Sequence, residues 1–156
     1  TVYKGQWAAG KRNGVGTYRH SSGAVYSGDW VDDIRHGRGL YTYPDGSVYE
    51  GDWQRGKRTG QGILRHKSGF VYEGQFVNGK RHGQGISTLA DGAVYEGDWR
   101  DGKLNGSGGY RYPSGESYQG EFVDGKRHGL GIYTSVNGVV LECAWVNGAR
   151  AENGGL

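Results

Sequence analysis

The sequence has little of what marks the commonest protein classes. Its 156 residues include 2 prolines, 1 cysteine and no methionine. No apolar run reaches the length of about 18 residues that a transmembrane helix needs, and no signal-peptide pattern opens the chain. A single cysteine excludes an intrachain disulfide and fits a reducing compartment. Because the chain lacks methionine and begins Thr-Val-Tyr, we expect it to be a segment of a longer protein.

Apolar residues are also scarce, at 34% of the chain, which is too few for a thick two-layer core. The 33 glycines bring the composition close to that of low-complexity chains. Disorder is excluded by the 12 tyrosines, 5 tryptophans and 3 phenylalanines, because disordered chains are poor in aromatic residues. The composition therefore predicts a thin or extended fold.

A strict repeat explains the glycines. Tyrosine recurs every 23 residues, at Tyr3, Tyr26, Tyr49, Tyr72, Tyr95 and Tyr118. An aromatic residue follows four positions later, at Trp7, Trp30, Trp53, Phe76, Trp99 and Phe122, and Trp145 follows Leu141 in the same way. Five glycine columns share the period and hold 31 of the 33 glycines. The sequence is therefore one template repeated six times, with a degenerate seventh copy from Leu141, and we expect a single array over residues 1–156.

Each repeat has the pattern of a β-hairpin. Residues 47–53 alternate Tyr, Gly and Trp on one face with Val, Glu and Asp on the other, which is a strand period. Residues 54–60 are polar and rich in glycine, which predicts a hairpin loop, and a second strand is expected from residue 60 to 64. A tight turn at 67–69 leads to the next repeat. The predicted fold class is all-β: an elongated, twisted, single-sheet antiparallel meander of hairpins, forming a solenoid-like rod.

Glycine within the strands predicts how such a thin sheet is packed. Gly51 lies between Tyr49 and Trp53, and a strand position without a side chain leaves a slot that a ring can cover. We expect Gly60 and Gly62 to do the same on the second strand, so that rings stack over backbone.

The pattern Tyr-x-Gly-x-Trp-x-x-Gly-Lys-x-x-Gly-x-Gly, intact at residues 49–62 and 95–108, resembles the membrane occupation and recognition nexus (MORN) repeat. The resemblance covers almost the whole chain. It implies a rod-like β-meander without catalysis of its own, in the cytoplasm, associated with the cytoskeleton or with the inner face of a membrane. Repeat-only arrays of this kind resemble the MORN scaffolds of protist cytoskeletons, which implies a homodimer and a cytoskeletal or other protein partner.

Two repeats depart from the template. In the second, Asp33-Ile34 replaces Gly-Lys, so that loop should differ in geometry and charge. In the last, Leu141 replaces Tyr and Cys143 replaces Gly. The apolar end predicts an antiparallel homodimer through the C-terminal repeats, and a solvent-facing cap is the alternative. The residues expected in the dimer interface are Tyr133, Leu141, Cys143 and Trp145.

Cys143 allows a further hypothesis. In a two-fold dimer, Cys143 and its mate would approach each other, and His128 from each chain would complete a Cys2His2 zinc site. The simpler interpretation is that Cys143 is a small apolar residue of the terminal repeat.

Basic residues recur in the predicted hairpin loops and should line one edge of the sheet. Such a row predicts binding of phosphoinositides or other acidic phospholipids, because each Lys or Arg near an anionic leaflet contributes about 1 kcal/mol. The alternative is a solvated face, whose charge is compensated by strand acids such as Glu50, Asp52 and Asp98. The candidate lipid-binding residues are Lys11, Arg12, Arg35, Lys57, Arg58, Lys80, Arg81, Lys103, Lys126 and Arg127.

The same residues bear on nucleic-acid binding, catalysis and protein binding. Nucleic-acid binding is not expected, since the net charge is only +3 and the aromatic columns have structural roles. No catalytic motif occurs, and the recurring histidines have the pattern of turn residues, so no enzyme is expected. A protein ligand is the stronger rival, because the aromatic face carries rings outside the regular columns. These rings are Tyr41, Tyr43, Tyr110, Tyr112 and Tyr133.

Overall fold

The computed structural model describes residues 1–151, which divide along the sequence into two compact units, the first ending at Lys80 and the second beginning at Arg81. The strands of the first unit are β1 (Val2–Ala8), β2 (Lys11–Arg19), β3 (Val25–Val31), β4 (Ile34–Thr42), β5 (Val48–Gln54), β6 (Lys57–Arg65) and β7 (Val71–Val77). β8 (Lys80–Thr88) begins at the boundary. The second unit continues with β9 (Val94–Arg100), β10 (Lys103–Arg111), β11 (Ser117–Val123), β12 (Lys126–Thr134), β13 (Val140–Val146) and β14 (Ala149–Arg150).

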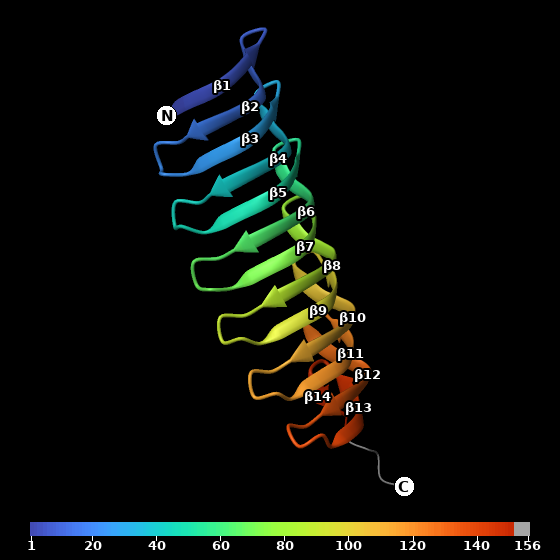
Figure 1. Ribbon diagram of the computed structural model, residues 1–156. Helices are drawn as coiled ribbons and strands as arrows, with labels where there is room; N and C mark the ends of the chain where they lie inside the picture. Colours follow the sequence, from blue (N-terminus) through green and yellow to red (C-terminus); the bar gives the residue numbers. More distant parts are fainter. Residues whose placement is uncertain (152–156) are drawn as a thin grey trace. The chain divides into compact units, whose positions relative to one another are not determined.

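In both units the strand order is the chain order, and consecutive strands pair antiparallel (Figure 1). The predicted class, an all-β antiparallel meander of hairpin repeats, is confirmed. No helix long and apolar enough to span a bilayer occurs within residues 1–151. The prediction of one array over residues 1–156 stays a prediction.

The two strands of each repeat are joined by a two-residue turn. Arg55 and Gly56 both have positive φ, at 50° and 79°. This is the mirror-image turn whose twist matches a hairpin, and glycine favours it at the second position. β6 then starts at Lys57, so the predicted loop over residues 54–60 is wrong. The polar residues Lys57 and Arg58 lie in a strand. A loop was expected there because polar residues and glycine are typical of loops, although they also occur in strands.

A bulge follows within the second strand. The register between β5 and β6 shifts between Gly51 and Trp53, and Gly60 there has a φ of 110°. The carboxylate of Asp52 accepts the Gln61 N–H of the bulge at 2.9 Å. The expectation that Gly60 opens a slot for a ring is therefore wrong, because glycine is needed there for its backbone conformation.

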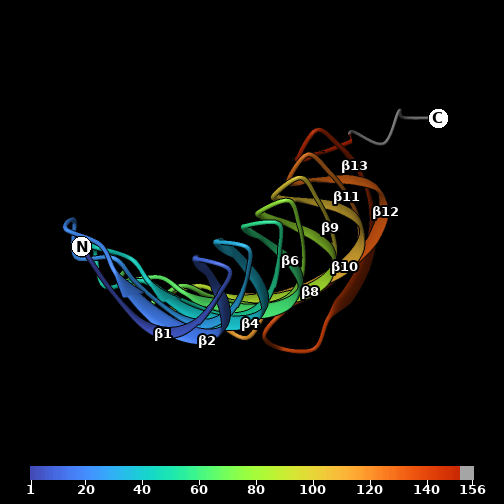
Figure 2. The ribbon, with the colours of Figure 1, turned by 90° about the horizontal axis from the view of Figure 1, so that it is seen from above.

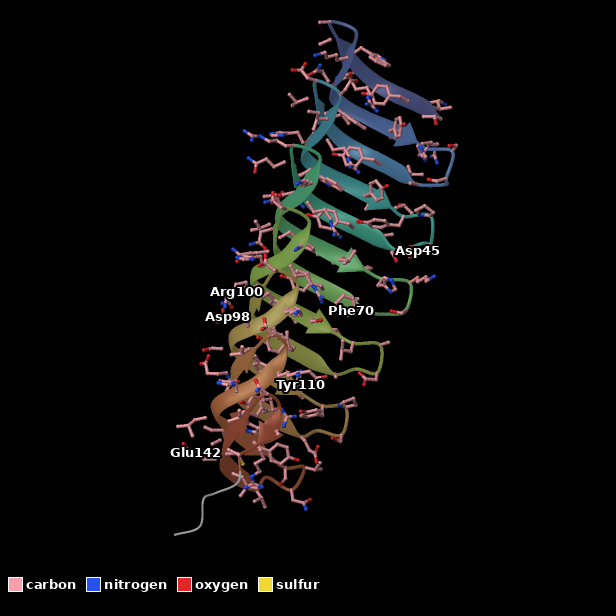
Figure 3. All side chains as sticks on the ribbon, turned by 180° about the vertical axis from the view of Figure 1, so that it is seen from behind. Asp45, Phe70, Asp98, Arg100, Tyr110 and Glu142 are labelled. Carbon is pink, nitrogen blue, oxygen red and sulfur yellow. The ribbon has the colours of Figure 1, made fainter. Side chains whose placement is uncertain are left out.

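Successive repeats are joined by three-residue turns, as expected at residues 67–69. The His66 N–H donates to the Phe70 carbonyl at 2.7 Å, and Gly69 has a φ of 94°. In the first unit, Asp45 and Phe70 mark these turns at one end of the strands (Figure 3). The two-residue turns occupy the opposite end, so each unit has two rows of turns.

Tyrosine rings packed on glycine backbone form the core. Tyr49 is fully buried, and a Cβ built on Gly62 of the next strand would lie 2.5 Å from the Tyr49 ring. The Tyr49 hydroxyl donates to the Asp52 carbonyl at 2.9 Å. The predicted ring slot is thus confirmed at Gly62. The strands are curved along their length (Figure 2), and we call the side that carries these rings the aromatic face.

Burial of these tyrosines predicts loss of stability at alkaline pH. Desolvation raises the pKa of Tyr49 to about 12 and also raises the pKa of Tyr26 and Tyr95. An unfolded tyrosine titrates near pH 10, so its contribution is complete below about pH 10 and is lost as the pH rises toward 12. Denaturant titrations across this range should show the unfolding midpoint falling. The unfolding midpoint of Tyr49→Phe, which has no ionisable hydroxyl at this position, should fall less steeply with pH. An equal slope in the variant would show that the loss of stability does not come from Tyr49.

Candidate functional site

Arginines of the aromatic face join neighbouring repeats. The guanidinium of Arg35 lies 4.6 Å from the Trp53 ring centre and 5.2 Å from that of Tyr41. Its Nη2 donates to the Gly56 carbonyl, one repeat later, at 3.1 Å. Arg58 makes the same bond to Gly79. The cation–π contact and the hydrogen bond act together across the repeat boundary, so the residue has a structural role.

The structure thus divides the predicted basic row into two sets. The arginines are half-buried over rings: Arg12, Arg35, Arg58, Arg81 and Arg127. The lysines are exposed at the start of the second strand in five of the repeats: Lys11, Lys57, Lys80, Lys103 and Lys126. Of the predicted basic row, the lysines are therefore the members whose side chains are exposed to solvent.

Strand acids lie on the face opposite the aromatic face. In β5, Asp52 alternates with Gly51 and Trp53, so its side chain points away from the rings. It accepts the bulge N–H of Gln61, and its other oxygen lies 3.6 Å from the Arg38 guanidinium. Asp98 accepts from Ser107 in the same way at 2.8 Å. Asp98 and Arg100 are labelled on β9 in Figure 3. Asp52 and Asp98 therefore accept the N–H of the bulge in their own repeat, and they lie on the other face from the arginines that pack over the rings.

The first unit has a groove of about 530 Å³ on its aromatic face. It runs from His20 and Ser22, at a three-residue turn, to Asp33 and Gly56, at the two-residue turns. Its walls and floor are formed by Arg12, Tyr18, Ala24, Tyr26, Trp30, Ile34, Arg35 and Tyr41. We call this the Ile34 groove. It follows the strands across the sheet.

Asp33-Ile34, which replaces the Gly-Lys of other repeats, determines the charge and the apolar surface of the groove. The Asp33 carboxylate accepts both the backbone N–H of Arg12, at 2.9 Å, and its Nε, at 3.0 Å. These hydrogen bonds hold the pKa of the Asp33 carboxyl below its usual value. The Arg12 charge is therefore neutralised, and Ile34 presents an apolar chain where other repeats have lysine. The equivalent groove one repeat later, beside Lys57, has about 290 Å³.

The histidines have structural surroundings, as their repetition predicts. His20 Nδ1 lies 2.7 Å from the Ser22 hydroxyl, within a turn, and His66 contacts Ser68 in the same way. His82 Nδ1 accepts the Asp101 N–H of the next repeat at 3.3 Å. His20 and His66 thus bond a serine of their own turn, and His82 joins the turns of two neighbouring repeats.

The C-terminal repeat differs from the others in its polar contacts. Trp53 Nε1 donates to the Gly39 carbonyl at 3.2 Å, and Trp99 to Gly85 at 3.1 Å. The matching Nε1 of Trp145 is buried without a partner among the described residues, as is Nδ1 of His128. Within the described residues, the last repeat therefore lacks the hydrogen bond from the Trp ring to a carbonyl that Trp53 and Trp99 make.

The predicted interface residues have mixed exposure. Leu141 is 43% exposed, Cys143 is 7% exposed in the glycine column, and Tyr133 and Trp145 are half-buried. The opposite face of the same hairpin is more apolar, which sequence reasoning missed. Leu130 is 65% exposed. We define the C-terminal patch as Leu130, Ile132, Val140, Ala144 and Val146, which share a face of β12 and β13.

A sequence signal for this patch existed. Leu130 stands where four other repeats have Arg38, Gln61, Gln84 and Ser107, whereas Val146 gives no such signal, because Val31, Val77 and Val123 occupy the same position. One acid, Glu142, lies on the same face and is labelled in Figure 3.

One edge of β13 is largely unpaired within the described residues. β14 pairs with only Trp145 and Val146, while the Ala151 N–H reaches the Ala144 carbonyl. The backbone from Val140 to Cys143 faces outward on that side. An open strand edge is a template for another strand.

The predicted zinc site has no single-chain equivalent. Among residues 1–151, no group of three or more His, Cys, Asp or Glu side chains converges. Cys143 and His128 would therefore need ligands from a second chain, and the zinc site stays a prediction.

Comparisons with known proteins agree with this geometry. The model of the MORN repeat matches residues 3–25, 26–48, 49–70, 72–94, 95–117 and 118–140. No curated protein gives a significant match. Among solved structures, the chain is similar to the SAS-4 (dCPAP) TCP domain of Drosophila melanogaster, solved in complex with a proline-rich motif of Ana2 (dSTIL). The identity is 15%, the coverage 83% of this chain and 71% of that one, and the TM-score 0.53.

The TCP10 domain of Danio rerio CPAP is similar at 14% identity, covering 88% of this chain and 75% of that one, with a TM-score of 0.31. At such identities the likeness to the SAS-4 domain concerns fold alone. The family is shown instead by the repeat model, which matches nearly all of residues 3–140. The chain therefore belongs to the MORN-repeat family.

Proposed function

We propose that the chain is a non-catalytic scaffold that forms a homodimer through its C-terminal repeat and connects a cytoskeletal or membrane-associated assembly. The observation that carries this proposal is the C-terminal patch beside the open edge of β13. Contiguous exposed apolar side chains mark interaction sites. A second copy offers the same strand, so two β13 edges can pair antiparallel about a two-fold axis.

Light scattering after size exclusion tests the dimer. The wild-type chain should elute as a dimer, and Leu130→Gln with Val146→Gln should shift it to a monomer at the same concentration. Both changes install residues found at these positions in other repeats, so the fold should be retained. Val77→Gln, an exposed valine at the same repeat position as Val146, is the matched control and should remain dimeric. A wild-type monomer at all concentrations would remove the dimer from the proposal.

A protein partner is supported by the structural comparison. The SAS-4 domain, which shares this fold, was solved with a proline-rich motif of another protein bound to it. We propose that this chain likewise binds a protein segment at the cytoskeleton or at the inner face of a membrane. Detergent extraction of cells that express the tagged chain tests the location, since a cytoskeletal scaffold should stay in the insoluble fraction.

Binding to acidic phospholipid is the second candidate, and the exposed lysine column favours it. Each lysine near an anionic surface contributes about 1 kcal/mol, so three engaged lysines would give measurable binding. In vesicle flotation, the chain should float with phosphatidylcholine vesicles that contain a phosphoinositide and not with phosphatidylcholine alone. Lys11→Gln, Lys57→Gln and Lys80→Gln together should abolish flotation without disturbing the half-buried arginines. Flotation that is independent of these lysines would reject the site.

A further inference from the structure

We propose that the Ile34 groove binds an extended, acidic segment of a partner protein, in which an apolar side chain and a carboxylate lie two residues apart. The proposal deepens the scaffold function given above and names the chemistry of one partner. It rests on three features of the groove: its shape, its charge and its unused hydroxyl groups.

Shape favours an extended peptide over a compact ligand. The groove follows the strand direction from the turn at His20 to the turn at Asp33, across the width of the sheet. Ile34 is 47% exposed at one end, and the half-buried rings of Tyr18 and Tyr41 lie along the floor. An apolar side chain placed between them would lose its contact with water, which is favourable by about 25 cal/mol per Å².

Charge favours an acidic segment. Asp33 is the one carboxylate among the groove residues, and Arg12 already occupies it at 3.0 Å. Arg35 donates one N–H to the Gly56 carbonyl and is in no described ion pair. Its guanidinium has five N–H donors in all. The groove therefore retains one uncompensated positive charge, which a partner carboxylate can neutralise with hydrogen bonds.

Hydroxyl groups favour peptide backbone. The core tyrosines use theirs internally, as Tyr26 does by donating to the Asp29 carbonyl at 2.9 Å. The hydroxyls of Tyr18 and Tyr41 have no such bond among the described contacts, although their rings pack near Trp30 and Trp53. An extended peptide brings carbonyl acceptors that need donors. These hydroxyls can supply them.

Side chains two residues apart in an extended segment point to the same side. An apolar residue and a carboxylate in that spacing can therefore both enter the groove, one toward Ile34 and the other toward Arg35. A basic segment would instead meet the Arg35 charge and be repelled.

Peptide display tests the inference without a known partner. A random-peptide library is selected on the immobilised wild-type chain, with the Ile34→Gln variant in solution as competitor. Enriched peptides should share an apolar residue and an acidic residue two positions apart. No enrichment, or enrichment of basic or of proline-rich peptides without an acid, would overturn the proposal. The dimer measurement is separate, so the scaffold function can stand if the groove proposal fails.

A synthetic copy of an enriched peptide then locates the site by fluorescence anisotropy. Ile34→Gln should weaken binding by about tenfold, the effect of removing roughly one buried apolar contact. Val77→Gln, outside the groove, should bind as the wild type does.

Arg35 is tested by a double-mutant cycle, because its loss also affects packing. Arg35→Gln should weaken the binding of the acidic peptide by about tenfold or more. A control peptide with Gln in place of the acid binds more weakly to the wild type, and its affinity should not change in the variant. Circular dichroism verifies that the variant is folded. Equal losses for both peptides would assign Arg35 a structural role only and would overturn the charge part of the proposal.

Discussion

Gly108→Ala is expected to lower the free energy of unfolding by about 3 kcal/mol, the upper range for overpacking a core. A Cβ at Gly108 would lie 2.6 Å from the Tyr95 ring, which is itself only 2% exposed. The ring cannot retreat without losing its hydrogen bond from the hydroxyl to the Asp98 carbonyl at 2.9 Å. Chemical denaturation followed by tryptophan fluorescence measures the loss, since Trp99 packs against Tyr95 with ring centres 5.3 Å apart.

The next residue supplies the control. Gly109 lies on the opposite face of β10, outside the repeating glycine columns, and a Cβ there would meet mainly the Oε1 end of the flexible Gln119 side chain. Gly109→Ala should be neutral, or stabilising by a few tenths of a kcal/mol through the unfolded chain. If both substitutions cost the same, the packing of tyrosine on glycine would not be the source of stability.

Arg58→Ala is expected to cost about 3 kcal/mol. The change removes a charged hydrogen bond to the Gly79 carbonyl, at 2.6 Å, which contributes about 1.5–3 kcal/mol. It also removes the guanidinium from above the Tyr49 and Phe76 rings, at 5.5 and 5.2 Å. Arg58→Lys should recover only part of this, because an ammonium lacks the planar fork that covers a ring and reaches a carbonyl at once.

Lys57 is the matched control, since it is the preceding residue of the same strand and is exposed. Lys57→Ala should change the free energy of unfolding by no more than about 0.5 kcal/mol. Urea titrations of the three variants give the comparison. If Arg58→Ala were as stable as Lys57→Ala, the arginines would be exposed to solvent and not held over the rings. They would then again be candidates for lipid binding.

The sequence predicted the parts of this fold that depend on period. Tyr49, Gly62 and Trp53 recur at fixed spacing, and spacing alone places a ring over a glycine of the next strand. The hairpin itself followed from alternation in residues 47–53.

The turn could not be predicted correctly from the same evidence. Lys57 and Arg58 are polar and flanked by Gly56 and Gly60, which is typical of a loop. What distinguishes a two-residue turn from a longer loop is the sign of φ at Arg55 and Gly56, together with the bulge at Gly60. Arginine seldom adopts a positive φ, so its residue type gave no indication of the conformation.

The candidate sites show a similar limit. The basic column was visible in the sequence, but neighbouring members such as Lys57 and Arg58 differ in burial, because Arg58 packs over the Tyr49 and Phe76 rings while Lys57 lies exposed beside the turn. The Asp33-Ile34 departure was visible too. The pairing of Arg12 with the Asp33 carboxylate, one repeat later, depends on the register between strands, and a single sequence does not show that register. The C-terminal patch was missed because Leu130 alone departs from polar residues in most other repeats, while valine at the Val146 position is common to several of them.

The reach of each contact along the chain bears on how the protein folds. The bond from Tyr49 to Asp52 spans 3 residues, that from Trp53 to Gly39 spans 14, and that from Arg58 to Gly79 spans 21. Because each of these contacts closes only a short stretch of chain, little loop entropy opposes its formation. Folding can thus start at any hairpin and spread to its neighbours, and a repeat emerging from the ribosome needs only the repeat made just before it.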